Sequence, residues 1–125
     1  MNNIYKKYQG KCVCDAGAYM SDEAKQLATY MKRRIKVTAK TEGMELVDCY
    51  IGHYDISGFI KKDEKFVYFN WDIPRGNGII NFNRSDAFAG FLIRTAQHEK
   101  DYKGGQNNFS SLQNFFPTVK RLLGA

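Results

Sequence analysis

The sequence predicts an α+β fold, in which an antiparallel sheet of four or five strands carries an N-terminal amphipathic helix and a C-terminal helix packed on one face. Three segments with different hydrophobic periods lead to this prediction. Apolar residues recur at helical spacing over residues 21–43, at the two-residue period of strands over 44–96, and again at helical spacing over 112–123. Strands in one run with helices at both ends are typical of α+β domains.

The first helix is expected to begin at Ser21, whose side chain suits an N-cap. Asp22 and Glu23 follow in the first turn, where the helix dipole favours negative charge, and Gly43 is a natural stop. Apolar side chains at positions i, i+3, i+4, i+7 and i+11 predict a stripe packed on the sheet. The members of this stripe are Ala24, Leu27, Ala28, Met31 and Ile35.

Three strands are expected in ELVDCYIG (45–52), HYDISGFIK (53–61) and KFVYFNWDI (65–73), with the polar turn KKDE between the last two. Their close succession predicts an antiparallel meander. Alternation within a strand predicts that its two sets of side chains lie on opposite faces. These sets are Val47, Cys49 and Ile51 against Leu46, Asp48 and Tyr50, and then Val67, Phe69 and Trp71 against Phe66, Tyr68 and Asn70.

The remaining elements are less regular. GIINFN (78–83) is expected to form a fourth strand, and AFAGFLIRTA (87–96) a fifth strand or a short helix that leads into a strand. Pro117 lacks an N–H and clashes with a preceding helical turn, so it is placed in the first turn of the last helix.

Length and composition limit the class of protein. A chain of 125 residues has the length of one domain, so we expect residues 1–125 to form a single domain. Hydrophobic residues make up 43% and aromatic residues 14% of the chain, which is typical of a globular protein. No apolar run approaches the roughly 20 residues that span a bilayer, and no apolar stretch follows the N-terminal lysines. We therefore expect a cytoplasmic protein without membrane contacts.

The cysteines indicate reduced thiols. Cys12, Cys14 and Cys49 are odd in number, which argues against a disulfide framework. The one-residue spacing in CVC does not fit a structural zinc site, whose paired cysteines are two to four residues apart. We therefore expect no metal and no cofactor.

Positive charge is concentrated near the N-terminus. The net charge is +6. Residues 1–42 contain nine basic and four acidic residues, a net charge of +5, whereas residues 43–125 contain ten and nine, a net charge of +1. In the first helix the basic side chains lie off the apolar stripe. Those we expect to bind a partner are Lys32, Arg33, Lys36 and Lys40.

A one-sided positive field favours phosphate-rich or acidic partners. The leading hypothesis is therefore a non-enzymatic protein that contacts nucleic acid, a nucleoprotein complex or an acidic protein surface through this helix and neighbouring loops. The alternative for the helix is an ordinary solvated face. Self-association into a homo-oligomer is a further expectation, based on aromatic side chains left exposed.

The loop HEKDYKGGQNNF (98–109) is the second candidate for partner contact. Its glycines let a backbone approach a ligand closely, and its amides offer paired donors and acceptors. The alternative is a plain connection between the last strand and the last helix. The expected contact residues of this region are Arg94, Lys100, Lys103, Gln106 and Asn107.

The same loop supports an enzymatic alternative. His98, Glu99 and Asp101 are titratable groups close together in sequence, as in an acid–base pair. They would serve a small nucleotide-binding protein or an enzyme that acts on phosphodiesters. No nucleophile, zinc or phosphate-loop motif accompanies them, since GxSxG, HExxH, CxxC and GxxxxGK[ST] are all absent.

Two further features have both a functional and a structural interpretation. Arg75, in IPRGNG (73–78), is expected on an exposed turn, where its planar side chain suits phosphate or carboxylate; the same residues also make a good turn. Aromatic side chains on strands either stack nucleic-acid bases on an open sheet face or belong to the core. The aromatic residues in question are Tyr5, Tyr8, Tyr50, Tyr54, Tyr68 and Trp71.

The segment IRTAQHEKDYKGGQNNF (93–109) resembles small accessory proteins of phages and mobile elements, including anti-defence proteins such as anti-CRISPRs. The resemblance implies an inhibitor that binds a host defence nuclease complex without catalysing a reaction. It implies no catalytic residues. Because this chain is basic, its contacts would be with guide RNA, DNA or an acidic protein surface, in the host cytoplasm.

Overall fold

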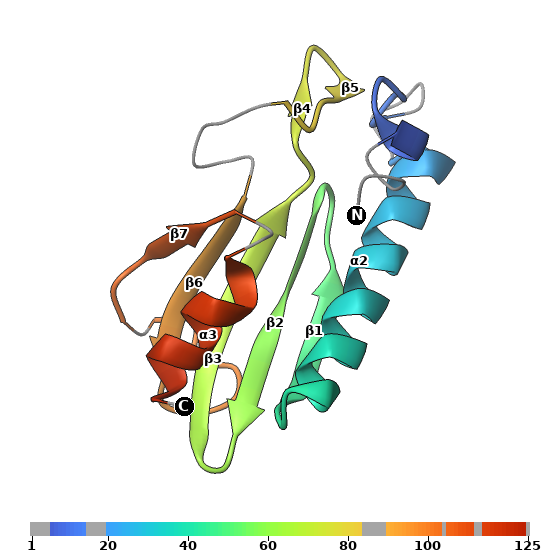
Figure 1. Ribbon diagram of the computed structural model, residues 1–125. Coiled ribbons are helices and arrows are strands. Elements are labelled where there is room, and N and C mark those ends of the chain that lie inside the picture. Colours follow the sequence, from blue (N-terminus) through green and yellow to red (C-terminus); the bar gives the residue numbers. More distant parts are fainter. Residues whose placement is uncertain (1–5, 15–19, 84–89, 104, 112–113, 125) are drawn as a thin grey trace.

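A computed structural model of the protein describes residues 6–14, 20–83, 90–103, 105–111 and 114–124. A five-stranded antiparallel sheet in the order β1-β2-β3-β6-β7 carries two helices (Figure 1). This arrangement confirms the predicted α+β class. The elements are α2 (Asp22–Thr41), β1 (Glu45–Ile51), β2 (Asp55–Lys62), β3 (Lys65–Asp72), β6 (Phe91–Ala96), β7 (Asn108–Ser110) and α3 (Phe115–Leu123).

Helix α2 has the predicted cap and the predicted buried stripe. The Ser21 side chain accepts a hydrogen bond of 3.0 Å from the backbone N–H of Ala24, which satisfies one free donor of the first turn. Gly43 follows the helix in a left-handed conformation, at φ 78°. All five predicted stripe residues are buried, and Ala39 extends the stripe by another turn.

Both helices pack on one face of the sheet, here called the inner face. Cross-strand pairs place Ile56, Trp71 and Phe91 on this face, because Ile56 pairs with Trp71 and Trp71 pairs with Phe91. Helix α3 adds Phe115, whose ring stacks on Phe91 with centroids 4.0 Å apart. The buried residues of both helices belong to one apolar cluster with the inner face. Figure 1 shows α2 alongside β1 and α3 over β3 and β6.

The predicted alternation of β1 is wrong in its first half. Leu46 pairs with the inner-face Ile60, and Val47 pairs with Phe59 on the opposite, outer face. The register shifts between Val47 and Tyr50, where Asp48 has a φ of 50°. This β-bulge adds one residue and reverses the side on which later residues point, so Ile51 returns to the inner face. The predicted faces of β3 are confirmed, since Val67, Phe69 and Trp71 are buried.

The predicted fourth strand does not join the main sheet. Its first residues form β5 (Ile79–Ile80), which pairs with β4 (Arg75–Gly76) in a separate two-stranded sheet. Asn77 and Gly78 between them both have positive φ, as a two-residue hairpin turn requires. The other side of β5 is occupied by residues 10–13, since Ile80 exchanges backbone hydrogen bonds with Gly10 and Lys11.

The C-terminal half contains one strand that we did not predict. β6 forms the predicted fifth strand, while the preceding residues 84–89 lie outside the described ranges. The short strand β7 lies within the segment expected to be a connection and pairs with the free edge of β6. Pro117 is the third residue of α3, which confirms its place in the first turn. Among the described residues, no helix combines the length and the apolar character needed to cross a bilayer.

Candidate nucleic-acid interface

The outer side of α2 carries several basic residues and, from Ala24 onward, no acidic one. From Ala24 to Thr41 the helix contains six basic and no acidic residues. Arg33, Lys36 and Lys40, all predicted contact residues, are exposed. Lys32, the fourth, is half-buried and lies close enough to Cys49 on β1 to act on the thiol: burial raises the pKa of Cys49, and the positive charge of Lys32 partly opposes this.

These charges repel one another without compensation. Lys32, Lys36 and Lys40 are spaced by four residues and therefore form a row on one side of the helix. In the parts of the chain that the structure describes, no carboxylate forms a salt bridge with a basic residue of α2; the ion pairs there join Arg75 to Asp72 and Lys120 to Glu42. Like charges at this spacing destabilise a helix by roughly 0.2–0.5 kcal/mol per pair.

A groove extends this basic surface toward the N-terminal segment. It has a volume of about 560 Å³ and lies between residues 7–8 and the first three turns of α2. The Tyr8 hydroxyl donates a 3.4 Å hydrogen bond to Gln26, which ties the segment to the helix. The charged groups of the lining are three basic residues and one acidic residue, namely Lys7, Lys25, Arg33 and Asp22.

The N-terminal segment is held in place from two sides. Val13 donates a backbone hydrogen bond to Gly78 of the β4–β5 hairpin. The Ser21 hydroxyl, besides capping α2, donates a 2.6 Å hydrogen bond to the carbonyl of Cys12. The groove is therefore built by contacts between the start of α2, the hairpin and residues 7–13. Sequence analysis did not find Lys7, because only tertiary structure brings it to α2.

The second predicted contact region is a strap, residues 97–103, that crosses the outer face of the sheet. Its anchor is Tyr102, whose ring lies edge-on to Phe59 and Tyr68, with centroids 5.5 and 5.8 Å away. Phe59 is fully buried although it lies on the face opposite the helices. Arg94 places its guanidinium 4.6 Å from the centre of the Tyr68 ring. The strap thus has a structural role. The contact of Tyr102 with the sheet was not predicted from the sequence.

Hydrogen bonds within the strap use the titratable side chains. Asp101 accepts from the backbone N–H groups of Gln97 and Lys103, at 2.9 and 3.1 Å, and these bonds hold the pKa of its carboxyl below the usual value. The ring of His98 lies 2.8 Å from the carbonyl oxygen of Glu99. The Glu99 carboxyl shares a hydrogen bond with Asp48, which raises the pKa of Glu99. The three groups of the enzymatic alternative therefore have separate partners.

The predicted contact residues do not form one surface. Those of α2 lie beyond the inner face. Lys100 and Lys103 are exposed in the strap on the outer side, and Gln106 and Asn107 are exposed just before β7 at the edge of the sheet. Arg75 donates to the carbonyl of Ile73 at 3.1 Å, and its guanidinium lies 4.6 Å from the Tyr54 ring. Arg75 is therefore used within the fold.

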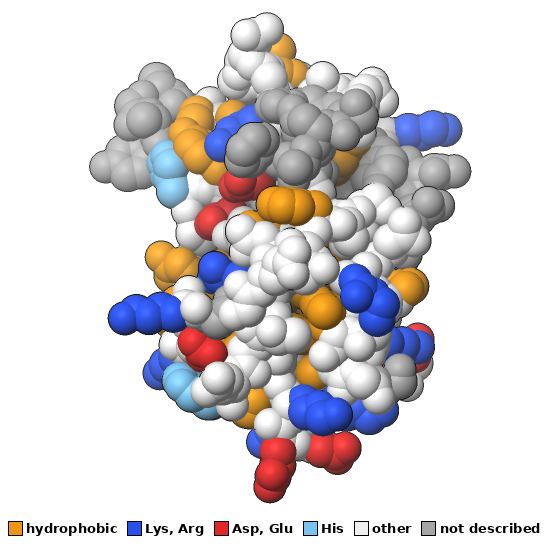
Figure 2. Space-filling view, turned by 90° about the vertical axis from the view of Figure 1, so that its left-hand side faces the viewer, with side chains coloured by type: hydrophobic (Ala, Val, Ile, Leu, Met, Phe, Trp, Pro, Cys, Tyr) orange, Lys and Arg blue, Asp and Glu red, His pale blue; other side chains and the backbone are white. Residues whose placement is uncertain are grey.

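The aromatic residues also divide between core and surface. Tyr8 and Trp71 are buried, whereas Tyr50 on the outer face is 66% exposed. Tyr5 lies outside the described residues. The outer face carries charges of both signs, since Asp48 and Glu99 lie near Lys61. Figure 2, which views the side that carries β7, shows acidic and basic side chains intermixed there. From Ala24 onward, by contrast, the charged residues of α2 are all basic.

The fold and this surface define a small α+β protein with a basic helix on the outside of its helical layer. Within the described ranges, no three His, Cys, Asp or Glu side chains gather as metal ligands. Comparison with protein-family models, curated proteins and solved structures finds no match to this chain.

Proposed function

We propose that this protein binds nucleic acid through the outer side of α2 and the groove beside Lys7, and that it does so without catalysing a reaction. The observation that carries the proposal is the row of Lys32, Lys36 and Lys40, which has no acidic partner among the described residues. A row of repelling charges lowers the stability of the free protein. A polyanionic partner would relieve this repulsion on binding.

The size of the surface suits a nucleic-acid backbone. A helix of 20 residues is about 30 Å long, which corresponds to the rise of roughly nine base pairs. Each phosphate neutralised by a lysine or arginine releases condensed counterions, and this release drives binding without sequence preference. Lys7, Lys25 and Arg33 in the groove would hold backbone phosphates beside the helix.

A nucleoprotein target is the narrower form of the proposal. The resemblance of residues 93–109 to anti-defence proteins supports an inhibitor of a host nuclease complex. In that case α2 would contact the guide RNA or DNA of the complex, and the strap would contact its protein. A cytoplasmic location in the host follows from such a target.

Two matched double variants test the proposal. Arg33→Glu/Lys36→Glu and Lys100→Glu/Lys103→Glu change four exposed residues and shift the net charge by the same amount. Fluorescence anisotropy with labelled double-stranded DNA, single-stranded DNA and RNA should show at least about tenfold weaker binding for the α2 variant, and less than about threefold for the strap variant. Equal losses would indicate a net-charge effect, and a larger loss for the strap variant would place the interface on the outer face. Both results contradict the proposal.

A further inference from the structure

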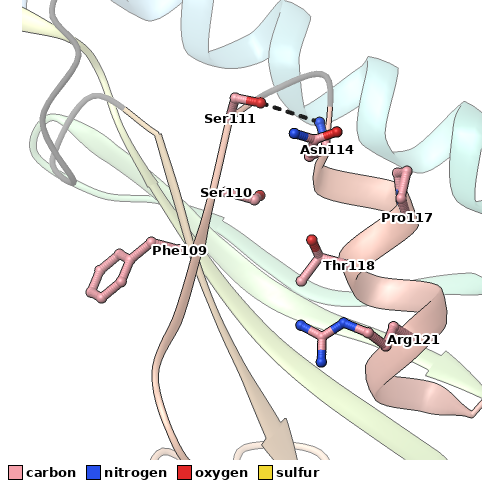
Figure 3. A pocket seen from close by; sticks show the side chains of 7 residues that line it. All are labelled: Phe109, Ser110, Ser111, Asn114, Pro117, Thr118 and Arg121. Carbon is pink, nitrogen blue, oxygen red and sulfur yellow. Dashed lines mark hydrogen bonds between the residues drawn. The ribbon is translucent and has the colours of Figure 1, made fainter.

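A second groove lies between strand β7 and helix α3 (Figure 3). Strand β7 forms one edge of the sheet, and β1 forms the other. Its volume of about 530 Å³ falls within the usual range for small-molecule sites. Helix α3 faces it with Asn114, Pro117, Thr118 and Arg121, which follow the i, i+3, i+4, i+7 spacing of one helix side. Along a helix this spacing covers about 10 Å, the length of a small organic molecule.

The polar groups of this groove favour an anion. They are the hydroxyls of Ser110, Ser111 and Thr118, the amide of Asn114 and the guanidinium of Arg121. None of the described residues that line the groove is acidic. In the described part of the chain, Arg121 has no carboxylate partner, whereas the neighbouring Lys120 pairs with Glu42 at 2.5 Å. Among the described lining residues, the only charged group is therefore the exposed guanidinium of Arg121, which is available to a ligand.

The hydroxyl of Ser110 provides a second, independent argument for a ligand in this groove. Its cross-strand partner is Phe91, so its side chain lies on the inner side, toward α3, as Figure 3 shows. The Ser110 oxygen is buried and has no hydrogen-bond partner among the described residues. A buried hydroxyl without a partner is destabilising, and it commonly marks a place where another molecule completes the hydrogen bonding. The adjacent Phe109 points away from the helix.

The N-terminus of α3 adds backbone N–H groups that can also donate hydrogen bonds to an anion. Among the described residues, no side chain caps this helix, and its first turn, Phe115–Thr118, contains no acidic residue. The backbone N–H groups at a helix N-terminus lack acceptors within the helix and favour negative charge. The Ser111 hydroxyl instead accepts from the N–H of Asn114 at 3.3 Å, before the helix begins.

We infer that the groove between β7 and α3 binds a small organic anion, whose carboxylate or phosphate group pairs with Arg121 and accepts a hydrogen bond from the Ser110 hydroxyl after that side chain changes rotamer and reaches the groove. Arginine offers two parallel N–H donors that match either group. This inference does not depend on nucleic-acid binding by α2, because the described residues that line the two grooves are all different.

Amide-detected NMR titration tests the inference directly. Sodium phosphate and sodium acetate would be added separately to the full chain, each compared with sodium chloride at equal ionic strength. We expect saturable shifts that centre on Ser110, Thr118 and Arg121. The tighter of the two probes identifies the ligand class as phosphate or carboxylate. Absence of saturation with both, or shifts centred on the lysines of α2, would overturn the inference.

Single substitutions distinguish a specific anion site from nonspecific attraction of the anion to positive charge. Arg121→Gln should weaken binding of the tighter probe by at least about tenfold, since charge-assisted hydrogen bonds have this strength. Lys120→Gln, with the same change in charge on the same helix, should weaken it less than about twofold. Ser110→Ala should weaken binding while the melting temperature is maintained or rises. Equal losses for Arg121→Gln and Lys120→Gln would overturn the inference.

Discussion

Tyr102 lies edge-on to Phe59, with ring centroids 5.5 Å apart, although a polar loop carries Tyr102 and the middle of β2 carries Phe59. Through this contact the strap closes the outer face of the sheet over an aromatic residue that neither helix covers. The loop richest in titratable groups is thus also part of the packing. Within the strap, Tyr102 is the residue whose ring contacts the aromatic side chains of the sheet.

Replacing Tyr102 with alanine should destabilise the protein by about 1–2 kcal/mol. The expected loss combines one aromatic contact with the partial exposure of Phe59. Urea unfolding would measure it. Tyr50→Ala is a suitable control, because Tyr50 lies on the same face with a similar exposed fraction, 66% against 57% for Tyr102, but makes no ring contact with another described residue. It should change stability by less than about 0.5 kcal/mol. Equal losses for the two variants would show that the Tyr102 contact contributes nothing specific.

Ser110→Ala should stabilise the free protein by about 1 kcal/mol, because it removes a buried hydroxyl that has no partner among the described residues. Ser111→Ala should have the opposite effect, since the Ser111 hydroxyl accepts a hydrogen bond from the backbone of Asn114. Thermal unfolding of both variants in a buffer without phosphate or carboxylate would test this pair. A lower melting temperature for Ser110→Ala would show that its hydroxyl is already satisfied.

Because of Asp101, the stability of the protein should decrease at acidic pH. Its backbone hydrogen bonds lower the pKa of the folded state below that of the unfolded chain. The stabilisation from these bonds is therefore fully present above the unfolded value of about 4 and is lost as the pH falls through the lower folded value. Asp101→Asn should reduce the melting temperature at pH 7 and flatten its fall below about pH 4. Parallel curves for variant and wild type between pH 2 and 7 would contradict this.

Lys36→Glu should raise stability and lower affinity together. The change removes two like-charge pairs and creates two opposite-charge pairs, with Lys32 and Lys40, which predicts a gain of about 0.8–2 kcal/mol. Lys36→Gln removes the repulsion alone and should give about half of this gain. Urea unfolding at low salt measures both variants. A loss of stability in either would mean that the row is not a destabilising feature of the free protein.

The helices and the central strands could be predicted because local sequence determines them. Ser21 caps α2 as expected, and the apolar stripe of that helix is buried. The β1 alternation failed because a bulge at Asp48 depends on a backbone conformation that hydrophobic spacing does not encode. GIINFN has the composition of a strand, but the turn at Asn77–Gly78 makes it the second arm of a short hairpin.

The candidate sites could be predicted only where one element supplies the residues. The basic side of α2 follows from helical spacing, so its exposed residues were found directly. The two grooves were not found, because each joins segments that are distant or of unpredicted structure. Lys7 meets α2 through tertiary contacts, and Ser110 faces α3 because β7 pairs with β6.

The most direct test of nucleic-acid binding by α2 is the salt dependence of affinity. For the wild-type protein, the logarithm of the association constant should fall linearly with the logarithm of salt concentration. Arg33→Glu/Lys36→Glu should make this slope shallower by roughly two, one for each lost phosphate contact, while Lys100→Glu/Lys103→Glu should leave it nearly unchanged. A wild-type affinity that does not change between 50 and 200 mM salt, or the same slope in all three proteins, would contradict the account.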